Sequence, residues 1–315
     1  WNIACYGDGV DTTAVTIDGW VTDDDNYLRI YTPWQPLETR IRQRHEGVWD
    51  QSKYCLVTTR RLYGSIYVQD EYVHIEGLQI DNDYQGETGN NSTIVCNRKG
   101  LKVSGCILRR TGKSPGSGVD IDAVPSGSTV DIWNNIIYGF SVAGIYYDYG
   151  GNNYTFSICN NTIVDITQRG IHIRDSSNGD VTLYLRNNLV FNTGTQDYNI
   201  NTFSNRDYDC NLGEDPPILG DANYVQVSVE GTDLFLDYDN DDFHIKSTSE
   251  AKDAGVDLSS DPDRPFSDDV DGDTRSGDWD IGADQACTSI YRSVGPGNTL
   301  PLATGAGNDL TIYGS

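Results

Sequence analysis

The 315-residue chain has no methionine, few basic residues and no long apolar run. Because it begins at Trp1 without an initiator methionine, we expect a processing or cloning boundary there, with any signal peptide already removed. No stretch reaches the roughly 18 apolar residues that suggest a membrane-spanning helix, so we predict no membrane span. Lys and Arg number 22 against 47 Asp and Glu, and the net charge of −25 argues against nucleic-acid binding. The same charge disfavours polyanionic sugars unless bound cations or a local basic patch reverse the local field.

The seven cysteines form no CxxC pair, and their spacing does not suggest a zinc site. Scattered cysteines in an acidic chain rich in Gly and Asn are typical of disulfides in an oxidising compartment. We therefore predict a secreted or cell-surface protein, with Cys5–Cys55 and Cys210–Cys287 as candidate disulfides near the two ends. An odd number of cysteines leaves at least one thiol free or paired with another chain, and the sequence does not decide the connectivity.

The most informative feature of the chain is a repeat. Gly-Val-Asp-Ile-Asp at 118–122 returns as Gly-Ile-Tyr-Tyr-Asp at 144–148 and Gly-Ile-His-Ile-Arg at 170–174, with a weaker copy at 197–201. A fixed period of this length predicts a solenoid with one turn per repeat. No helical period of useful length lies between the copies, which argues against a leucine-rich repeat. We predict an all-β fold: a right-handed, single-stranded parallel β-helix with an irregular C-terminal cap.

The same period divides the chain into four parts. Residues 1–72 are predicted to form N-terminal coils with a loop insertion at 33–52, and residues 73–204 form the regular coils. Residues 205–285, rich in Asp, Gly and Pro, form an irregular closing segment. Residues 286–315 are an extra β segment or the start of a further module.

A second motif with this period ends in pairs of asparagines. Asn tolerates the left-handed backbone angles of a tight corner, and stacked Asn side chains can bond to one another along a coil. We predict at least one internal asparagine ladder, drawn from Asn134, Asn135, Asn160, Asn161, Asn187 and Asn188.

The closing segment carries a family resemblance. Residues 242–255 (DFHIKSTSEAKDAG), 269–275 (DVDGDTR) and 280–284 (DIGAD) resemble the C-terminal segment of secreted bacterial proteins of the right-handed parallel β-helix, or pectate-lyase-like, superfamily. The chain departs from that pattern at Glu250, where Pro is usual, and at Gln285, where Glu is common. The resemblance implies the fold and secretion. It does not imply one activity, because members include lyases, hydrolases and adhesins.

Strand alternation in the repeat places two columns of polar side chains on one outer face. They are Asp120–Tyr146–His172–Asn199 and Asp122–Asp148–Arg174–Asn201. As an active face, Asp122 and Asp148 would share a proton or a calcium ion, His172 would act as general acid or base, and Arg174 would hold a uronate carboxylate. Asp120, Tyr146, Asn199 and Asn201 would be ligand-binding candidates. The alternative is a solvated polar ladder in which Arg174 neutralises Asp148.

The closing segment also offers a metal candidate. Asp269, Asp271 and Asp273 place carboxylates at alternate positions around a glycine, which predicts either a structural calcium ion or a plain Asx turn. No other cofactor is required.

Three functions follow from these observations. The catalytic motif sets of polygalacturonases are absent, and no Lys lies near the two polar columns. We therefore favour an extracellular structural or adhesive module that self-associates, or joins further modules, through the ends of its coil. The alternatives are a secreted polysaccharide lyase or glycoside hydrolase acting on the polar face, and non-catalytic glycan binding there.

Overall fold

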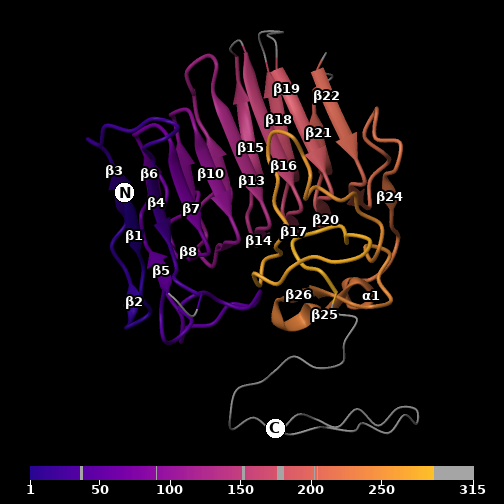
Figure 1. Cartoon of the computed structure of the whole chain (residues 1–315), viewed down its shortest axis with the longest axis horizontal. Helices are drawn as coiled ribbons and strands as arrows, with labels where there is room; N and C mark the ends of the chain where they lie inside the picture. Colours follow the sequence, from indigo (N-terminus) through magenta and orange to yellow (C-terminus); the bar gives the residue numbers. More distant parts are fainter. Residues whose placement is uncertain are drawn as a thin grey trace, which may run out of the picture.

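The computed structural model describes residues 1–35, 38–89, 91–150, 153–175, 181–201, 203 and 205–286. Its strands wind into a coil of three long parallel sheets, and each turn contributes one strand to each sheet (Figure 1). The predicted all-β parallel β-helix is therefore confirmed. Among the named strands of the described ranges, only the short pair β25–β26 is antiparallel.

We call the three sheets A, B and C in the order in which one turn visits them. Sheet A contains β1 (Asn2–Ala4), β4 (Leu28–Tyr31), β7 (Val73–Glu76), β10 (Leu101–Ser104), β13 (Thr129–Trp133), β16 (Tyr154–Cys159), β19 (Val181–Arg186) and β22 (Asn205–Asp209). Sheet B contains β2 (Val10–Asp11), β5 (Cys55–Thr58), β8 (Gln79–Asn82), β11 (Ile107–Arg109), β14 (Ile136–Tyr138), β17 (Thr162–Ile166), β20 (Leu189–Thr193), β23 (Leu212–Gly213) and β24 (Val225–Gln226). Sheet C contains β3 (Val15–Ile17), β6 (Ile66–Val68), β9 (Ile94–Cys96), β12 (Val119–Ile121), β15 (Ala143–Tyr149), β18 (Arg169–Asp175) and β21 (Gln196–Ile200).

Aliphatic side chains stack inside the coil in register. Val119 pairs with Ile145, Ile145 pairs with Ile171, and all three are fully buried. Because side chains alternate along a strand, the residue that follows each of these three points to the outer face of sheet C. The repeat seen in the sequence is thus the length of chain that makes one turn.

Glycine opens the first three copies of the repeat, at 118, 144 and 170, because successive turns approach closely there. A Cβ atom on Gly144 would lie 2.5 Å from the Cγ2 of Ile163 and 2.9 Å from the carbonyl oxygen of Gly170. The second of these atoms is backbone of the next turn and cannot rotate away. The glycine is therefore a packing requirement of the coil.

An asparagine ladder runs inside the corner between sheets A and B. The side-chain amides donate from Asn135 to Asn161 (2.9 Å), from Asn161 to Asn188 (3.0 Å) and from Asn188 to Asn211 (3.0 Å). Asn211 then donates to the carboxylate of Asp221 at 2.8 Å, which ends the ladder. Sequence reasoning found the first three members and missed the last two, because the period is irregular after residue 204.

The preceding asparagine of each pair has a different role. Asn134, Asn160 and Asn187 have φ angles of 54°, 51° and 56°, the left-handed region that Asn tolerates. Their amide groups donate outward to backbone carbonyls of the closing segment, at Asp268, Gly282 and Val256 respectively. These three corner asparagines therefore form the turn and also bind the closing segment to the coil.

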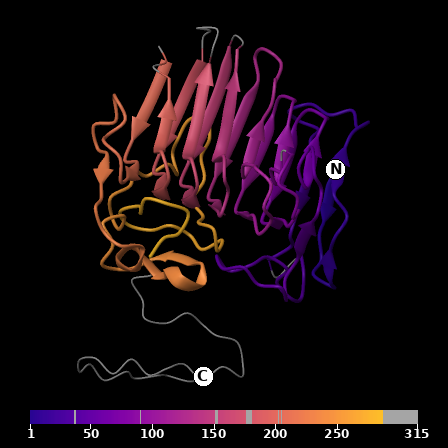
Figure 2. The same cartoon turned by 180° about the vertical axis from the view of Figure 1, so that it is seen from behind.

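After β24 the chain forms α1 (Gly231–Leu234), β25 (Phe235–Asp237), the 3₁₀ helix η1 (Tyr238–Asn240) and β26 (Asp242–Ile245). It then runs back along the outside of the coil without further helices or strands as far as Ala286, the last described residue of this segment. Both views show this closing segment on the lower side of the coil, where the 33–52 insertion also lies (Figures 1 and 2). The two meet where the Arg42 guanidinium donates to the carbonyl oxygen of Asp271.

Candidate functional site

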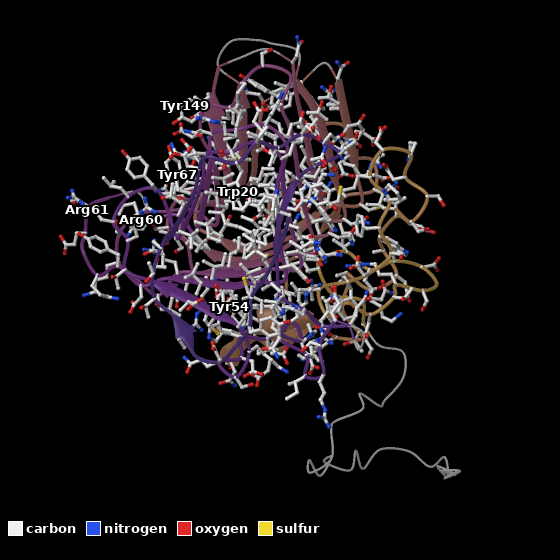
Figure 3. The ribbon with its side chains drawn as sticks, turned by 60° about the vertical axis from the view of Figure 1, so that its left-hand side comes forward. Trp20, Tyr54, Arg60, Arg61, Tyr67 and Tyr149 are labelled. Atoms are coloured by element: carbon white, nitrogen blue, oxygen red, sulfur yellow. The ribbon has the colours of Figure 1, made fainter. Side chains whose placement is uncertain are left out.

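The outer face of sheet C carries the first predicted column in the expected register. Asp120 pairs with Tyr146, Tyr146 with His172, and His172 with Asn199. Tyr67 of β6 and Tyr149 of β15 belong to the same sheet and project on the same side of the coil in Figure 3.

His172 is the most unusual side chain on this face. It is only 1% exposed, and its ring stacks on Tyr146 with centroids 4.8 Å apart. Its Nε2 lies 3.4 Å from a carboxylate oxygen of Asp148, and its Nδ1 has no hydrogen-bond partner among the described residues. Burial lowers the pKa of His172, and the contact with Asp148 offsets this only in part. The imidazole is therefore neutral at neutral pH.

The second predicted column is looser. Asp148 pairs in register with Arg174, but no ion pair joins their side chains among the described residues. Arg174 is exposed and its Nε donates to the Asn201 amide oxygen at 3.3 Å. Asp122 bonds to the Tyr149 hydroxyl, and this bond together with burial raises the pKa of Tyr149. Sharing of a proton or a calcium ion by Asp122 and Asp148 stays a prediction.

The acidic loop at 269–273 has its carboxylates turned in different directions. Asp269 Oδ1 accepts hydrogen bonds from the backbone N–H groups of Asp271 and Asp273, each at 3.0 Å, which is an Asx-turn arrangement. The Asp271 carboxylate faces His244, while Asp273 is exposed. Calcium binding by these three residues stays a prediction.

The predicted Cys5–Cys55 disulfide is wrong, because both thiols are free. Cys5 follows β1 in sheet A and contacts the Tyr54 hydroxyl, whereas Cys55 begins β5 in sheet B and accepts a hydrogen bond from Gln79 at 3.3 Å. Burial raises the pKa of each thiol to about 11. Cys210 is also free, and its predicted partner Cys287 lies outside the described residues.

The N-terminal end of the coil exposes apolar side chains. Trp1 is 77% exposed and Val21 is 97% exposed, and Ile3, Val10 and Val15 on the edge strands are also exposed. Association through this end, with another copy or a further module, stays a prediction. The described residues include no helix with the length and apolar character to cross a membrane.

A cleft of about 510 Å³, which sequence reasoning missed, lies on the outer face of sheet A. Its floor is a polar column on sheet A. Strand pairing there places five residues side by side on successive turns: Arg29, His74, Lys102, Asp131 and Ser157. Its walls are Arg44 of the insertion and residues 263–269 of the closing segment. We call it the sheet A cleft.

Most charges in the sheet A cleft are already paired. Glu76 accepts from Arg29 at 2.7 Å and from Arg44 at 2.5 Å, and Asp131 accepts from Arg264 at 2.5 Å. Lys102 differs, because it has no hydrogen bond or ion pair within the described ranges. The floor of the cleft therefore presents an unpaired ammonium group between neutralised neighbours.

Aromatic groups complete the sheet A cleft. The ring of Tyr27 stacks on His74 with centroids 3.9 Å apart, and Trp133 lies 6.3 Å from Phe266 across the floor and wall. Burial, with a further contribution from Lys102, lowers the pKa of His74 to about 4, so this ring is neutral at neutral pH. Burial raises the pKa of the Cys159 thiol, also in the lining, to about 11, which leaves it unreactive.

The inward and outward alternation of side chains that predicted the polar columns of sheet C also holds for the sheet A strands. Applied there, it would have predicted the residues on the floor of the cleft. The closing-segment wall comes from residues more than a hundred positions from the floor, and no local pattern connects the two.

Comparisons with known proteins add little to this geometry. No family model matches the chain, and no curated protein matches it. Among solved structures it is similar to the crystal structure of pectate lyase Pel9A, over 90% of this chain and 86% of that chain, with 12% sequence identity and a TM-score of 0.39. At that level of likeness we draw no functional argument from it.

Proposed function

We propose that this protein is an extracellular adhesive module that binds an acidic polysaccharide in the sheet A cleft without cleaving it. The observation that carries the proposal is Lys102, an unpaired ammonium group on the floor of the cleft. A carboxylate of a uronate sugar would supply the missing anion, because a cation in a partly enclosed site attracts a carboxylate more strongly than one in open water.

The shape and lining of the cleft support a sugar ligand. Ligand sites are concave and combine apolar or aromatic surface with a few convergent polar groups. Here Trp133, Phe266 and Tyr27 supply the aromatic surface, and Lys102 with Ser104 supplies polar groups beside it. Four Lys and Arg side chains and five carboxylates line the cleft, so its charges are closer to balance than the 22 basic and 47 acidic residues of the whole chain.

The same contacts argue against catalysis in the cleft. Hydrolysis of a glycosidic bond needs two carboxyl groups free to transfer a proton or attack carbon. On the floor of the cleft, Glu76 is held by two arginines and Asp131 by Arg264. The wall carboxyl groups of Asp263, Asp268 and Asp269 make no ion pair among the described residues, and they lie on the closing segment rather than on the floor beside Lys102. We therefore expect binding without turnover.

The proposal is tested by glycan-array and calorimetric binding of the whole chain to uronate-containing and neutral polysaccharides. We expect binding of the uronate polymers, loss of at least tenfold in affinity in Lys102→Ala and Trp133→Ala, and partial retention in Lys102→Arg. Tyr146→Ala, on sheet C, is the matched control and should bind normally. Equal binding by Lys102→Ala and the unaltered chain would refute the site.

A second function, polysaccharide cleavage on sheet C, is favoured by His172 alone. A buried, neutral imidazole with a nitrogen free of hydrogen bonds, beside Asp148, is a reasonable general base. The assay is release of unsaturated products or reducing ends from the polymers that bind. Turnover that disappears in His172→Gln would support this function and replace the non-catalytic proposal.

A further inference from the structure

A buried cluster of metal-binding side chains lies apart from both faces described above. One ligand atom from each of His244, Asp271 and Asp284 can be chosen so that all three lie within 4.8 Å of one another. The three side chains are 1%, 5% and 2% exposed. They come from β26 and from two separate stretches of the closing segment, so the fold brings together groups that are far apart in the sequence.

The hydrogen bonding of His244 fixes which ring nitrogen faces the cluster. Its Nδ1 bonds to the carboxylate of Asp242, so a neutral His244 ring would carry its proton on Nδ1. Its Nε2 then turns a lone pair toward the carboxylate of Asp271. A lone pair facing an anion is repulsive, so a positive charge has to lie between them. A carboxylate on the far nitrogen of a histidine is the usual support of a metal-bound imidazole.

The distance between His244 Nε2 and the Asp271 carboxylate favours a metal ion over a proton as the positive charge between them. Nε2 lies 3.3 Å from both carboxylate oxygens of Asp271. A charge-assisted N–H···O bond is shorter, at about 2.7–2.9 Å. Two ligands of a tetrahedral ion with bonds of about 2.0 Å are about 3.3 Å apart, which agrees with the observed distance.

We infer that His244, Asp271 and Asp284 bind a divalent transition-metal ion of the zinc class, with Asp242 orienting the histidine. An imidazole ligand and tetrahedral spacing disfavour calcium, which takes six to eight oxygen ligands. This set shares only Asp271 with the carboxylates of the acidic loop.

The ion would be bound within the closing segment, at a point where the insertion packs against it. A Cβ atom on Gly47, whose φ is +73°, would lie 2.2 Å from His244 Nε2 and 2.7 Å from Asp271 Oδ1. The insertion therefore seals this cluster from one side with a residue that has no side chain. The ion would link β26 to two later stretches of the closing segment, which also forms one wall of the sheet A cleft.

The test measures metal content and stability of the whole chain, without using glycan binding. After chelation and dialysis, Zn²⁺ should rebind at one ion per chain by elemental analysis and raise the melting temperature. Co²⁺ should give the visible absorption of a tetrahedral site. His244→Gln and Asp284→Asn should lose the ion, and Asp242→Asn should weaken binding about 10- to 100-fold. Asp273→Asn, in the exposed part of the acidic loop, should bind normally.

Two results would overturn the inference. If no zinc-class ion binds to the folded chain, His244 is a protonated histidine paired with aspartates. If Ca²⁺ binds, Zn²⁺ does not, and Asp273→Asn abolishes binding, the acidic loop is the metal site. If His244→Gln does not fold, the Co²⁺ spectrum of the unaltered chain and the Asp242→Asn affinity still decide the matter.

Discussion

Sheets A and C are built by the same coil, yet their outer faces differ. On sheet C the column Asp120–Tyr146–His172–Asn199 lies on an outer face where Asp148 and Arg174 are exposed. On sheet A the equivalent column through Lys102 is walled by the insertion and by the closing segment. The coil supplies a row of side chains on each face, and only the added segments turn one of those rows into a cleft. A site on a β-helix therefore depends on what covers the coil.

Electrostatics differ between the two faces in the same way. The two floor carboxylates of the sheet A cleft, Glu76 and Asp131, are held in ion pairs with arginines from other segments. On sheet C, Arg174 donates to Asn201 at 3.3 Å, and His172 Nδ1 has no hydrogen-bond partner in the part of the chain that the structure describes. Substitutions should therefore cost more stability near sheet A than on the outer face of sheet C.

The largest effect should come from the ladder beneath the sheet A corner. Asn161→Ala removes a buried amide that donates to Asn188 and to the carbonyl of Ile132, and we expect a loss of about 3 kcal/mol in unfolding free energy. Denaturant unfolding measures it. Asn199→Ala, at a half-buried position on sheet C, is the control and should cost under about 1 kcal/mol. Equal losses would remove the distinction between the two regions.

Sheet C also contains a closely packed position, Gly144, where a substitution should lower stability. Gly144→Ala should cost about 2 kcal/mol, because the added methyl group meets the backbone of Gly170 in the next turn. Gly127→Ala tests a glycine with no atom near its Cβ position, although its φ of +79° adds some strain of its own. A cost for Gly144→Ala no greater than that for Gly127→Ala, by thermal or denaturant unfolding, would contradict the packing argument.

Arginines on the two faces should give a smaller difference in stability. Arg264→Ala should cost about 1.5 kcal/mol, since it leaves the carboxylate of Asp131 without its partner in a mostly buried position. Arg174→Ala, on the exposed face, should change the unfolding free energy by less than about 0.5 kcal/mol. A double-mutant cycle with Asp131→Asn isolates the first interaction, and a coupling energy near zero would count against it.

The smallest effect concerns two histidines, one on each face. Both have pKa values below 6.5 in the fold, about 4 for His74, so each is neutral at pH 7. The unfolded chain therefore binds more protons below pH 6.5. Their contribution to stability is complete above that pH and declines as the pH falls toward the folded pKa values. NMR titration measures both, with His74→Gln and His172→Gln to assign the signals. A pKa at or above 6.5 for either ring would contradict the burial argument.

Much of the fold could be predicted because a parallel coil repeats one local rule. Val119, Ile145 and Ile171 occupy equivalent positions in successive copies, and alternation alone places Asp120, Tyr146 and His172 outside. The asparagine pairs predicted the corner and its ladder for the same reason. Cysteine spacing has no comparable rule, and the predicted pairing of Cys5 with Cys55 was wrong, since Cys5 follows β1, Cys55 begins β5, and both thiols are free.

The sequence by itself determined the period of the coil, the inward and outward faces of its strands, and the residues at its corner. These are set by backbone geometry that acts within one turn, or between a turn and the next. The tertiary structure alone decided where a cleft forms and which charges are neutralised there. It also decided that His244 meets Asp271 and Asp284. Those contacts join segments between roughly 30 and more than 100 residues apart, and they depend on how the insertion and closing segment pack on the finished coil.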